Sequence, residues 1–217
     1  MAVVRAADVA AGVPWRVFRW HRGQAHYSGW YWSATMGRHV VYESRLELAR
    51  LLLADFDPRV VSIAAQPFRV TGRSGDRARS HVPDFLLLDR DGLVTVVNVK
   101  PAGRLRKPEV AEALGWAGGV FAERAWRHEV WSGAPPVVLA NVRFLAAYRC
   151  GERVDAEMAG RLDGVVDGAV SIGELEAGWP DRAGEVRAAA LHLVWRGVFV
   201  ADLSVPLSAS TVLERAA

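Results

Sequence analysis

Hydrophobic side chains between Val41 and Phe56 recur with the period of an α-helix. The residues that share this spacing are Tyr42, Leu46, Ala49, Leu53 and Phe56. Because they would line one face, the segment is predicted to form an amphipathic helix. Asp57-Pro58 follows directly, and a proline disfavours the helical conformation in the residue before it, so the helix is expected to end there.

Short hydrophobic blocks after this helix predict β-strands. They are Val60–Val70, His81–Leu88 and Leu93–Lys100, and the intervening Thr71–Ser80 is expected to be a polar loop. The sequence Asp-Arg-Asp-Gly between the last two blocks is typical of a hairpin turn. Both strands beside this turn are apolar on both faces, which indicates a sheet covered on its two sides.

The pattern then alternates between helix and strand. Pro108 can begin a helix that runs to about Glu123. Trp126–Trp131 is predicted to be a strand, and Val137–Arg149 is predicted to be a further helix. Residues 1–150 are therefore predicted to form one α/β domain, in which helices flank a mixed sheet.

The remainder of the chain has a different pattern. Asp155–Val166 and Arg182–Arg196 are predicted helices, and Ser171-Ile-Gly-Glu174 between them has the spacing of a capping box. Val198–Leu203 is a predicted strand. Three helices followed by a short strand pair are typical of a winged helix, so residues 151–217 are expected to form a small winged-helix-like domain.

The composition is that of a folded protein, with 51% hydrophobic and 24% charged residues among 217. No apolar run reaches the length of a membrane span, and residues 1–12 lack the pattern of a secretory leader, so a cytoplasmic protein is expected, with no membrane partner. Cys150 is the only cysteine, which excludes an internal disulfide and a thiolate cluster for zinc. Any metal would need carboxylate, amide, carbonyl or histidine ligands.

The net charge of +3 is unevenly distributed. Residues 1–150 contain 21 Lys and Arg against 13 Asp and Glu, a balance of +8, whereas residues 151–217 contain 6 against 11, a balance of −5. A basic domain suits a polyanion such as double-stranded DNA, because neutralising phosphates releases counterions. The acidic tail is a poor DNA reader, and we expect it to dock a basic segment of a partner protein instead.

Residues 14–32 interleave aromatic rings with cations. The rings are Trp15, Phe18, Trp20, Tyr27, Trp30, Tyr31 and Trp32, and the cations are Arg16, Arg19, His21 and Arg22. One interpretation is an arm whose cations contact DNA phosphates while its rings stack on bases. The alternative is that the rings cover the domain's own core. Further candidate phosphate contacts are Arg38, Arg104, Arg106 and Lys107.

Chemically capable residues gather at the predicted hairpin. Val82-Pro83-Asp84-Phe85 belongs to its first strand and Val97-Asn98-Val99-Lys100 to its second, while Glu43 lies on the helix predicted upstream. Cutting a phosphodiester needs negative ligands for divalent cations, and a cation or base that positions the attacking water. Glu43, Asp84, Asn98 and Lys100 can supply both functions.

The hairpin register decides whether this site can form. Asn98 and Lys100 share a face because strand side chains alternate. If Leu88 paired with Leu93, Asp84 would lie opposite Val97 and face away from them. We therefore predict a register shifted by one residue, or a bulge, that brings Asp84 level with Asn98 or Val96.

These residues resemble the motif of PD-(D/E)xK nucleases, with Pro83-Asp84 as its first half and Asn98-x-Lys100 as its second. The chain is more closely similar to TnsA-like endonuclease subunits of heteromeric transposases, over roughly residues 14–149. The segments that carry this resemblance are Tyr42–Glu47, Gln66–Phe68, His81–Phe85 and Val97–Pro101. The resemblance implies a restriction-endonuclease-like fold.

The same resemblance implies roles for the individual residues. Glu43 and Asp84 would be acidic metal ligands for Mg²⁺ or Mn²⁺, and Lys100 would orient or activate the hydrolytic water. Asn98 would be a third ligand, although the superfamily has Asp or Glu here and the TnsA pattern has Gln. An amide oxygen can bind Mg²⁺ but brings no charge, so Asn98 predicts a weakened metal site.

The resemblance also implies partners. The chain would cut the 5′ ends of a mobile element, without a covalent intermediate. A DDE-type, TnsB-like transposase would cut and join the 3′ ends, and a TnsC-like AAA+ ATPase would regulate both. Two other functions remain open: a stand-alone restriction or defence nuclease, and a non-catalytic DNA- or protein-binding module, which the Asn98 substitution favours.

Three more residues are candidates for supporting roles. Glu47 follows Glu43 by one helical turn and could support the acidic site, or pair with solvent or a nearby arginine. Gln66 could contact the metal-bound water or substrate, or be a hydrogen-bonded core residue. His81, three residues before Asp84, is expected at the edge of the site.

Overall fold

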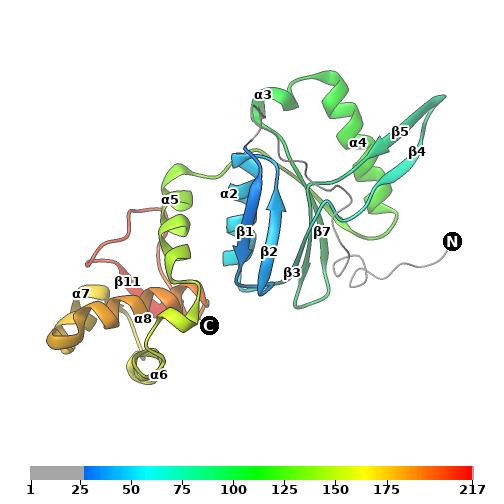
Figure 1. Ribbon diagram of the computed structural model, residues 1–217. Helices are drawn as coiled ribbons and strands as arrows, with labels where there is room; N and C mark the ends of the chain where they lie inside the picture. Colours follow the sequence, from blue (N-terminus) through cyan, green and yellow to red (C-terminus); the bar gives the residue numbers. More distant parts are fainter. Residues whose placement is uncertain (1–26, 217) are drawn as a thin grey trace. The chain divides into compact units, whose positions relative to one another are not determined.

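A computed structural model describes residues 27–216 of the chain. Their contacts divide them into two compact units (Figure 1). Unit 1 contains the described residues up to Asp55 together with Arg59–Gly133, and unit 2 contains Phe56–Pro58 and the described residues from Ala134 onward. Among these residues, no helix is both long enough and apolar enough to cross a bilayer.

Unit 1 is built on a four-stranded mixed sheet in the order β3-β6-β7-β8. Its strands are β3 (Val60–Ala65), β6 (Phe85–Asp89), β7 (Val94–Val99) and β8 (Arg127–Trp131). The pairs β3–β6 and β6–β7 are antiparallel, whereas β8 runs parallel to β7. A parallel pair needs a long crossover, and the chain between β7 and β8 supplies it with two helices. The predicted mixed α/β sheet is confirmed.

Helices cover both faces of this sheet. Successive residues of a strand point to opposite sides, and β8 illustrates this. Glu129 faces α2 (Arg45–Phe56), where it accepts two hydrogen bonds of 2.8 Å from Arg50. The preceding His128 faces α4 (Pro108–Ala122) and packs edge-on against Phe121. The apolar faces of β6 and β7 are therefore enclosed, as their sequences predicted.

The first helix begins later than its hydrophobic period suggested. The strand β2 (Arg38–Tyr42) extends to Tyr42, and it pairs with β1 (Gly29–Ser33) as an antiparallel hairpin. The helix starts only at Arg45, because the Ser44 hydroxyl accepts a hydrogen bond from the Glu47 amide and so caps the first turn. Tyr42 is buried as part of a strand and not as part of a helix.

The segment expected to be a polar loop is a second hairpin. It consists of β4 (Val70–Ser74) and β5 (Arg77–His81), joined by the two-residue turn Gly75-Asp76. Gly75 has a φ of +58°, which a glycine adopts without steric cost. Its strands lack alternating large apolar residues, so their sequence carries no strand signal. Figure 1 shows this hairpin projecting beyond the four-stranded sheet.

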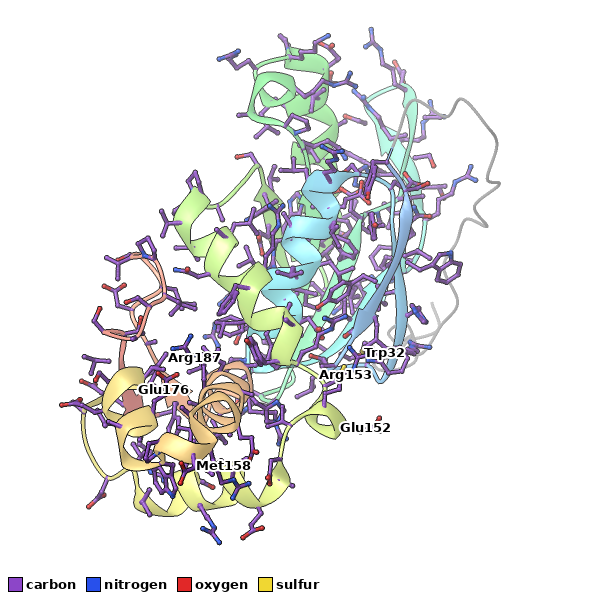
Figure 2. The ribbon with its side chains drawn as sticks, turned by 60° about the vertical axis from the view of Figure 1, so that its left-hand side comes forward. Trp32, Glu152, Arg153, Met158, Glu176 and Arg187 are labelled. Atoms are coloured by element: carbon purple, nitrogen blue, oxygen red, sulfur yellow. The ribbon has the colours of Figure 1, made fainter. Side chains whose placement is uncertain are left out.

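Unit 2 packs its helices around a buried central helix and adds a small sheet. Its helical elements are α5 (Pro136–Leu145), η1 (Ala146–Tyr148), η2 (Gly151–Arg153), α6 (Ala156–Val165), α7 (Ile172–Gly178), η3 (Pro180–Arg182) and α8 (Ala183–Trp195). Its strands are β9 (Val170–Ser171), β10 (Phe199–Val200) and β11 (Val212–Arg215), in the order β10-β11-β9. Ser171 and Glu174 form the predicted capping box. Figure 2 labels Glu176 of α7 and Arg187 of α8, which form an ion pair.

The division between the units differs from the boundary expected after residue 150. The helix α5 belongs to unit 2, because its Asn141 donates hydrogen bonds of 2.9 and 2.7 Å to the carbonyl oxygens of Leu203 and Val205. Asn141 also accepts a bond from the Leu207 amide. These contacts connect segments far apart in sequence, which the hydrophobic pattern around Gly151 could not reveal.

Candidate functional site

The register of the β6–β7 hairpin brings Asp84 level with Asn98. Phe85 pairs with Val97 and Leu88 with Val94, so the hairpin is shifted by one residue as predicted. The turn is held by Asp89, whose Oδ1 accepts hydrogen bonds from the amides of Asp91 and Leu93 at 3.0 and 2.8 Å. This side chain therefore helps to set the register on which the site depends.

Asp84 and Lys100 come together on one side of this hairpin. The Lys100 ammonium lies 3.2 Å from Asp84 Oδ2, and the same oxygen accepts a 2.6 Å hydrogen bond from the Val99 amide. The two side chains are 33% and 16% exposed, so the pair is accessible at the edge of the core. The carboxylate and the cation that the sequence placed on neighbouring strands do converge.

Gln66 connects Glu43 to this pair. Its side-chain amide donates to Glu43 Oε1 at 2.7 Å, and its backbone amide donates to the Asp84 carbonyl at 2.9 Å. Gln66 has a φ of +45°, which is uncommon for a residue with a side chain. It is only 7% exposed, and its Oε1 is buried without a hydrogen-bond partner. Buried polar atoms are normally paired, and unpaired ones often mark functional sites.

Glu47 is primarily a helix cap. Its carboxylate accepts hydrogen bonds from the Glu43 amide at 2.7 Å and from the Ser44 hydroxyl at 3.2 Å. Burial, together with the charges of Asp84 and Glu43, raises the pKa of Glu47 to about 7. The suggested pairing with an arginine is not among its contacts in the described structure. Glu47 therefore lies close enough to Asp84 and Glu43 for their negative charges to disfavour its ionised form.

The raised pKa of Glu47 predicts a pH-dependent stability. Because this pKa rises from 4.5 to about 7 on folding, the folded state binds the proton more tightly than the unfolded chain does. The stabilisation is complete below pH 4.5 and is lost as pH rises toward 7. Relative to Glu47→Gln, the wild type should lose up to about 3 kcal/mol across this range. Denaturant unfolding at several pH values measures it, and parallel profiles for the two proteins would contradict it.

Asn98 lies between two histidines. The residue is fully buried, its Oδ1 lies 2.6 Å from His81 Nε2, and its Nδ2 lies 2.8 Å from His128 Nε2. With the amide in this orientation, His81 donates to Asn98 and His128 accepts from it. Both atoms of the Asn98 amide are therefore engaged within the protein. Its use as a metal ligand, expected from the motif, would require exchange of the His81 hydrogen bond.

The surroundings of His81 and His128 favour their neutral forms. Burial lowers the pKa of His81, with Lys100 contributing in the same direction, and burial also lowers the pKa of His128. His81 thus lies at the edge of the site as predicted, in contact with Asn98. His128 belongs to no motif in the sequence. Its contact with Asn98 could be found only from the pairing of β8 with β7.

A close approach by α4 holds His128 in place. A Cβ added to Gly118 would lie 2.7 Å from His128 Nδ1, whereas one added to the neighbouring Gly119 would meet nothing. Gly118→Ala should therefore destabilise the fold, because the ring is held by Asn98 and Phe121 and must move. Gly119→Ala should stabilise it by about 0.5–1 kcal/mol through helix propensity. Thermal unfolding of both variants compares these effects, and equal stabilisation would show that His128 is free to shift.

The predicted phosphate contacts lie at the surface where they are described. Arg38 is exposed at the start of β2. Arg104, Arg106 and Lys107 are also exposed, but Arg104 belongs to a short helix, α3 (Ala102–Leu105), and not to a loop. Arg16, Arg19 and Arg22 lie outside the described residues. Of the aromatic segment, Tyr31 is buried, whereas Trp30 is exposed and Trp32, labelled in Figure 2, is partly so.

The described residues offer an oxygen-rich but incomplete donor set. Across residues 27–216, no three His, Cys, Asp or Glu side chains are arranged to hold a metal ion. Glu43 and Asp84 are the accessible carboxylates, and the unpaired Gln66 Oε1 is an amide oxygen beside them. Hard cations such as Mg²⁺ prefer these oxygen donors. From the sequence, Gln66 could be identified as a candidate site residue only because Gln66–Phe68 is one of the segments that resemble TnsA-like subunits.

Two sequence comparisons bear on the site. No protein-family model matches this chain, and no curated protein matches it in sequence. An assignment of function therefore depends on the geometry of Glu43, Gln66, Asp84 and Lys100.

Proposed function

We propose that this chain is a metal-dependent DNA endonuclease with a PD-(D/E)xK-type centre. The observation that carries the proposal is the approach of Lys100 to Asp84 across the hairpin, 3.2 Å between Nζ and Oδ2. Gln66 adds Glu43 to the pair through two hydrogen bonds. Glu43 lies just before α2, Asp84 just before β6 and Lys100 just after β7, and two acids with a lysine are the components that this chemistry requires.

The donors of this centre fit a divalent cation. Glu43 and Asp84 supply negative charge, and the buried, unpaired Gln66 Oε1 supplies an amide oxygen that lacks any partner in the protein. Burial is the main cause of the raised pKa of Glu47, and the charges of Asp84 and Glu43 add to it, so the three acids are close enough for a cation to be favoured among them. When bound, Mg²⁺ or Mn²⁺ supplies Lewis-acid stabilisation of the phosphate and lowers the pKa of water.

The protein's own groups then position the reactants. The Lys100 ammonium, anchored between Asp84 and the Val99 carbonyl oxygen at 3.0 Å, can donate to a water molecule or to a phosphate oxygen. The backbone amide of Lys100 is itself bonded to the Trp131 carbonyl of β8. The backbone of the lysine is therefore fixed by pairing with β8, and the contacts of its ammonium with Asp84 and Val99 limit the side-chain entropy lost when it contacts substrate.

The chain is further proposed to act as a TnsA-like transposase subunit with a C-terminal winged helix. Support comes from unit 2, in which β9 precedes α7 and the pair β10–β11 follows α8 in one antiparallel sheet. The balance of −5 in residues 151–217 suits docking to a basic segment of a partner better than binding DNA. Cutting of 5′ ends beside a DDE-type transposase, under an AAA+ ATPase, belongs to this proposal.

A nicking assay tests the proposed activity. Supercoiled plasmid is incubated with the full chain in Mg²⁺, in Mn²⁺ and in EDTA, and the products are separated in detergent to detect covalent adducts. We expect weak nicking that requires the metal and leaves no protein attached to DNA, because a transposase subunit should be nearly silent without its partners. Strong nicking by the chain alone would favour the stand-alone nuclease instead. Metal-independent nicking, or a detergent-stable adduct, would contradict the mechanism.

A non-catalytic DNA-binding module is the second candidate. It is favoured by the engagement of both Asn98 amide atoms with histidines, which leaves the centre with fewer available ligands than the motif supplies. Under this alternative, the chain binds duplex DNA but does not cut it in any metal. Cleavage that is lost on replacing Asp84 excludes it.

A further inference from the structure

We infer that the β4–β5 hairpin is an arm that holds duplex DNA by its phosphates beside the cutting site. The inference deepens the proposed function and rests on it. The sequence pattern gave this segment no role, since residues 71–80 were expected to be a loop. Its position, its charge and its exposed surface each point to DNA.

The base of the hairpin is the candidate site itself. The chain leaves β3 at Gln66, forms the hairpin, and returns to the sheet at Asp84, and the bond from the Gln66 amide to the Asp84 carbonyl closes the base. His81, the last residue of β5, contacts Asn98. DNA held along this arm would therefore lie next to Asp84 and Glu43.

The hairpin is strongly basic. Between Arg69 and Ser80 it contains four arginines and one acid, Asp76. Arg79 is ion-paired with Glu112 of α4. Arg73, at the far end, lies 4.0 Å from the exposed Asp76 carboxylate but is itself 68% exposed, and Arg77 is also exposed. Arginine is suited to phosphate because its guanidinium donates several hydrogen bonds in one plane.

One face of the hairpin is anchored to α4. A Cβ added to Gly72 would lie 3.1 Å from the Trp116 ring, so the strand and the helix approach closely. Trp116 also donates from Nε1 to the Arg73 carbonyl oxygen at 3.3 Å. Because an isolated two-stranded hairpin is marginal in water, these contacts give the arm its support. They leave the guanidinium groups of Arg73 and Arg77 exposed to a ligand, and Arg73 also donates to the Asp76 carbonyl oxygen at 2.9 Å within the turn.

The outer half of the arm is unsuited to a protein partner. The residues that alternate with the arginines are small or polar: Thr71, Ser74, Gly75, Ala78 and Ser80. Protein interfaces usually have large apolar or aromatic anchors at their centre, and this surface has none. A narrow two-stranded ribbon with cations at its end instead has the dimensions and charge to follow a groove of duplex DNA.

A DNA-binding titration tests the arm. The full chain binds a labelled DNA duplex in Ca²⁺, and the affinity is measured over a range of salt concentrations. Removing Arg73 and Arg77 together (R73A/R77A) should weaken binding about tenfold or more and reduce the slope of log affinity against log salt by about 2. The control R143A/R196A removes the same charge from exposed positions of unit 2 and should leave both quantities nearly unchanged.

The outcomes separate this inference from the proposed activity. If R73A/R77A binds DNA like the control while the wild type cuts DNA, the DNA-binding role of the arm is refuted and the proposed endonuclease activity is retained. If the double variant loses binding but the wild type cuts in no metal, the arm stands and the endonuclease is wrong. If the wild type binds no duplex, both are overturned. Unfolding curves for both variants check that the fold is intact.

Discussion

Replacing Asp84 with asparagine is expected to abolish DNA cleavage without unfolding the protein. The asparagine side chain has the same shape and can still accept the hydrogen bond from the Val99 amide, now 2.6 Å from Asp84 Oδ2. It brings no negative charge, so it removes both a ligand for the cation and the counter-charge of Lys100. The cleavage rate should fall about a thousandfold or more, roughly 4 kcal/mol of transition-state stabilisation.

Asp89→Asn is the matched control for this substitution. Asp89 is the last residue of β6, the strand that Asp84 directly precedes, and its replacement removes the same charge, but its Oδ1 only caps the hairpin turn. An asparagine can keep both of those bonds, so cleavage should remain near the wild-type rate. Equal loss of activity in the two variants would show that charge at Asp84 has no special role.

The largest loss of stability is expected from Asp55→Ala. Asp55 is 4% exposed and lies at the end of α2, where its carboxylate joins the helix to the β1–β2 hairpin. It accepts hydrogen bonds from the Tyr31 hydroxyl at 2.7 Å, the Ser33 hydroxyl, and the amides of Ala34 and Thr35 at 3.0 and 2.9 Å. Removing it leaves these buried donors unpaired, which should cost about 3–5 kcal/mol.

Denaturant unfolding compares Asp55→Ala with Asp91→Ala. Asp91 is an exposed residue of the β6–β7 turn, and its side chain should contribute within about 0.5 kcal/mol. We expect a lower unfolding midpoint for Asp55→Ala and an unchanged one for Asp91→Ala. Similar midpoints for the two would mean that the carboxylate does not hold the hairpin to α2.

The part of the fold that could be predicted is the part with periodic hydrophobic burial. Helix α4 and strands β6 and β7 bury large side chains, as Phe121, Phe85 and Val96 illustrate. The shifted register was also predictable, because Asp84 shares a face with Asn98 and Lys100 only when it lies level with Asn98 or Val96, and the structure has the first of these alignments. In each case one local pattern determines the outcome.

The rest depends on contacts between distant segments. The β4–β5 hairpin has no apolar alternation, and its support comes from Trp116 on a helix that follows later in the chain. The engagement of Asn98 by His128 requires knowing that β8 pairs with β7. The unpaired Gln66 oxygen likewise follows from its φ of +45° and its burial. None of these three features can be predicted from the sequence close to the residue concerned.

The central claim is that Glu43 and Asp84, with Gln66 beside them, bind one divalent cation. Diffraction from crystals of the full chain soaked in Mn²⁺, recorded at a wavelength where manganese scatters anomalously, locates the ion directly. We predict an anomalous peak within roughly 2.0–2.3 Å of oxygens from Glu43 and Asp84, as expected for a hard cation. A saturating soak that shows no peak there, or manganese bound only elsewhere, would contradict the account.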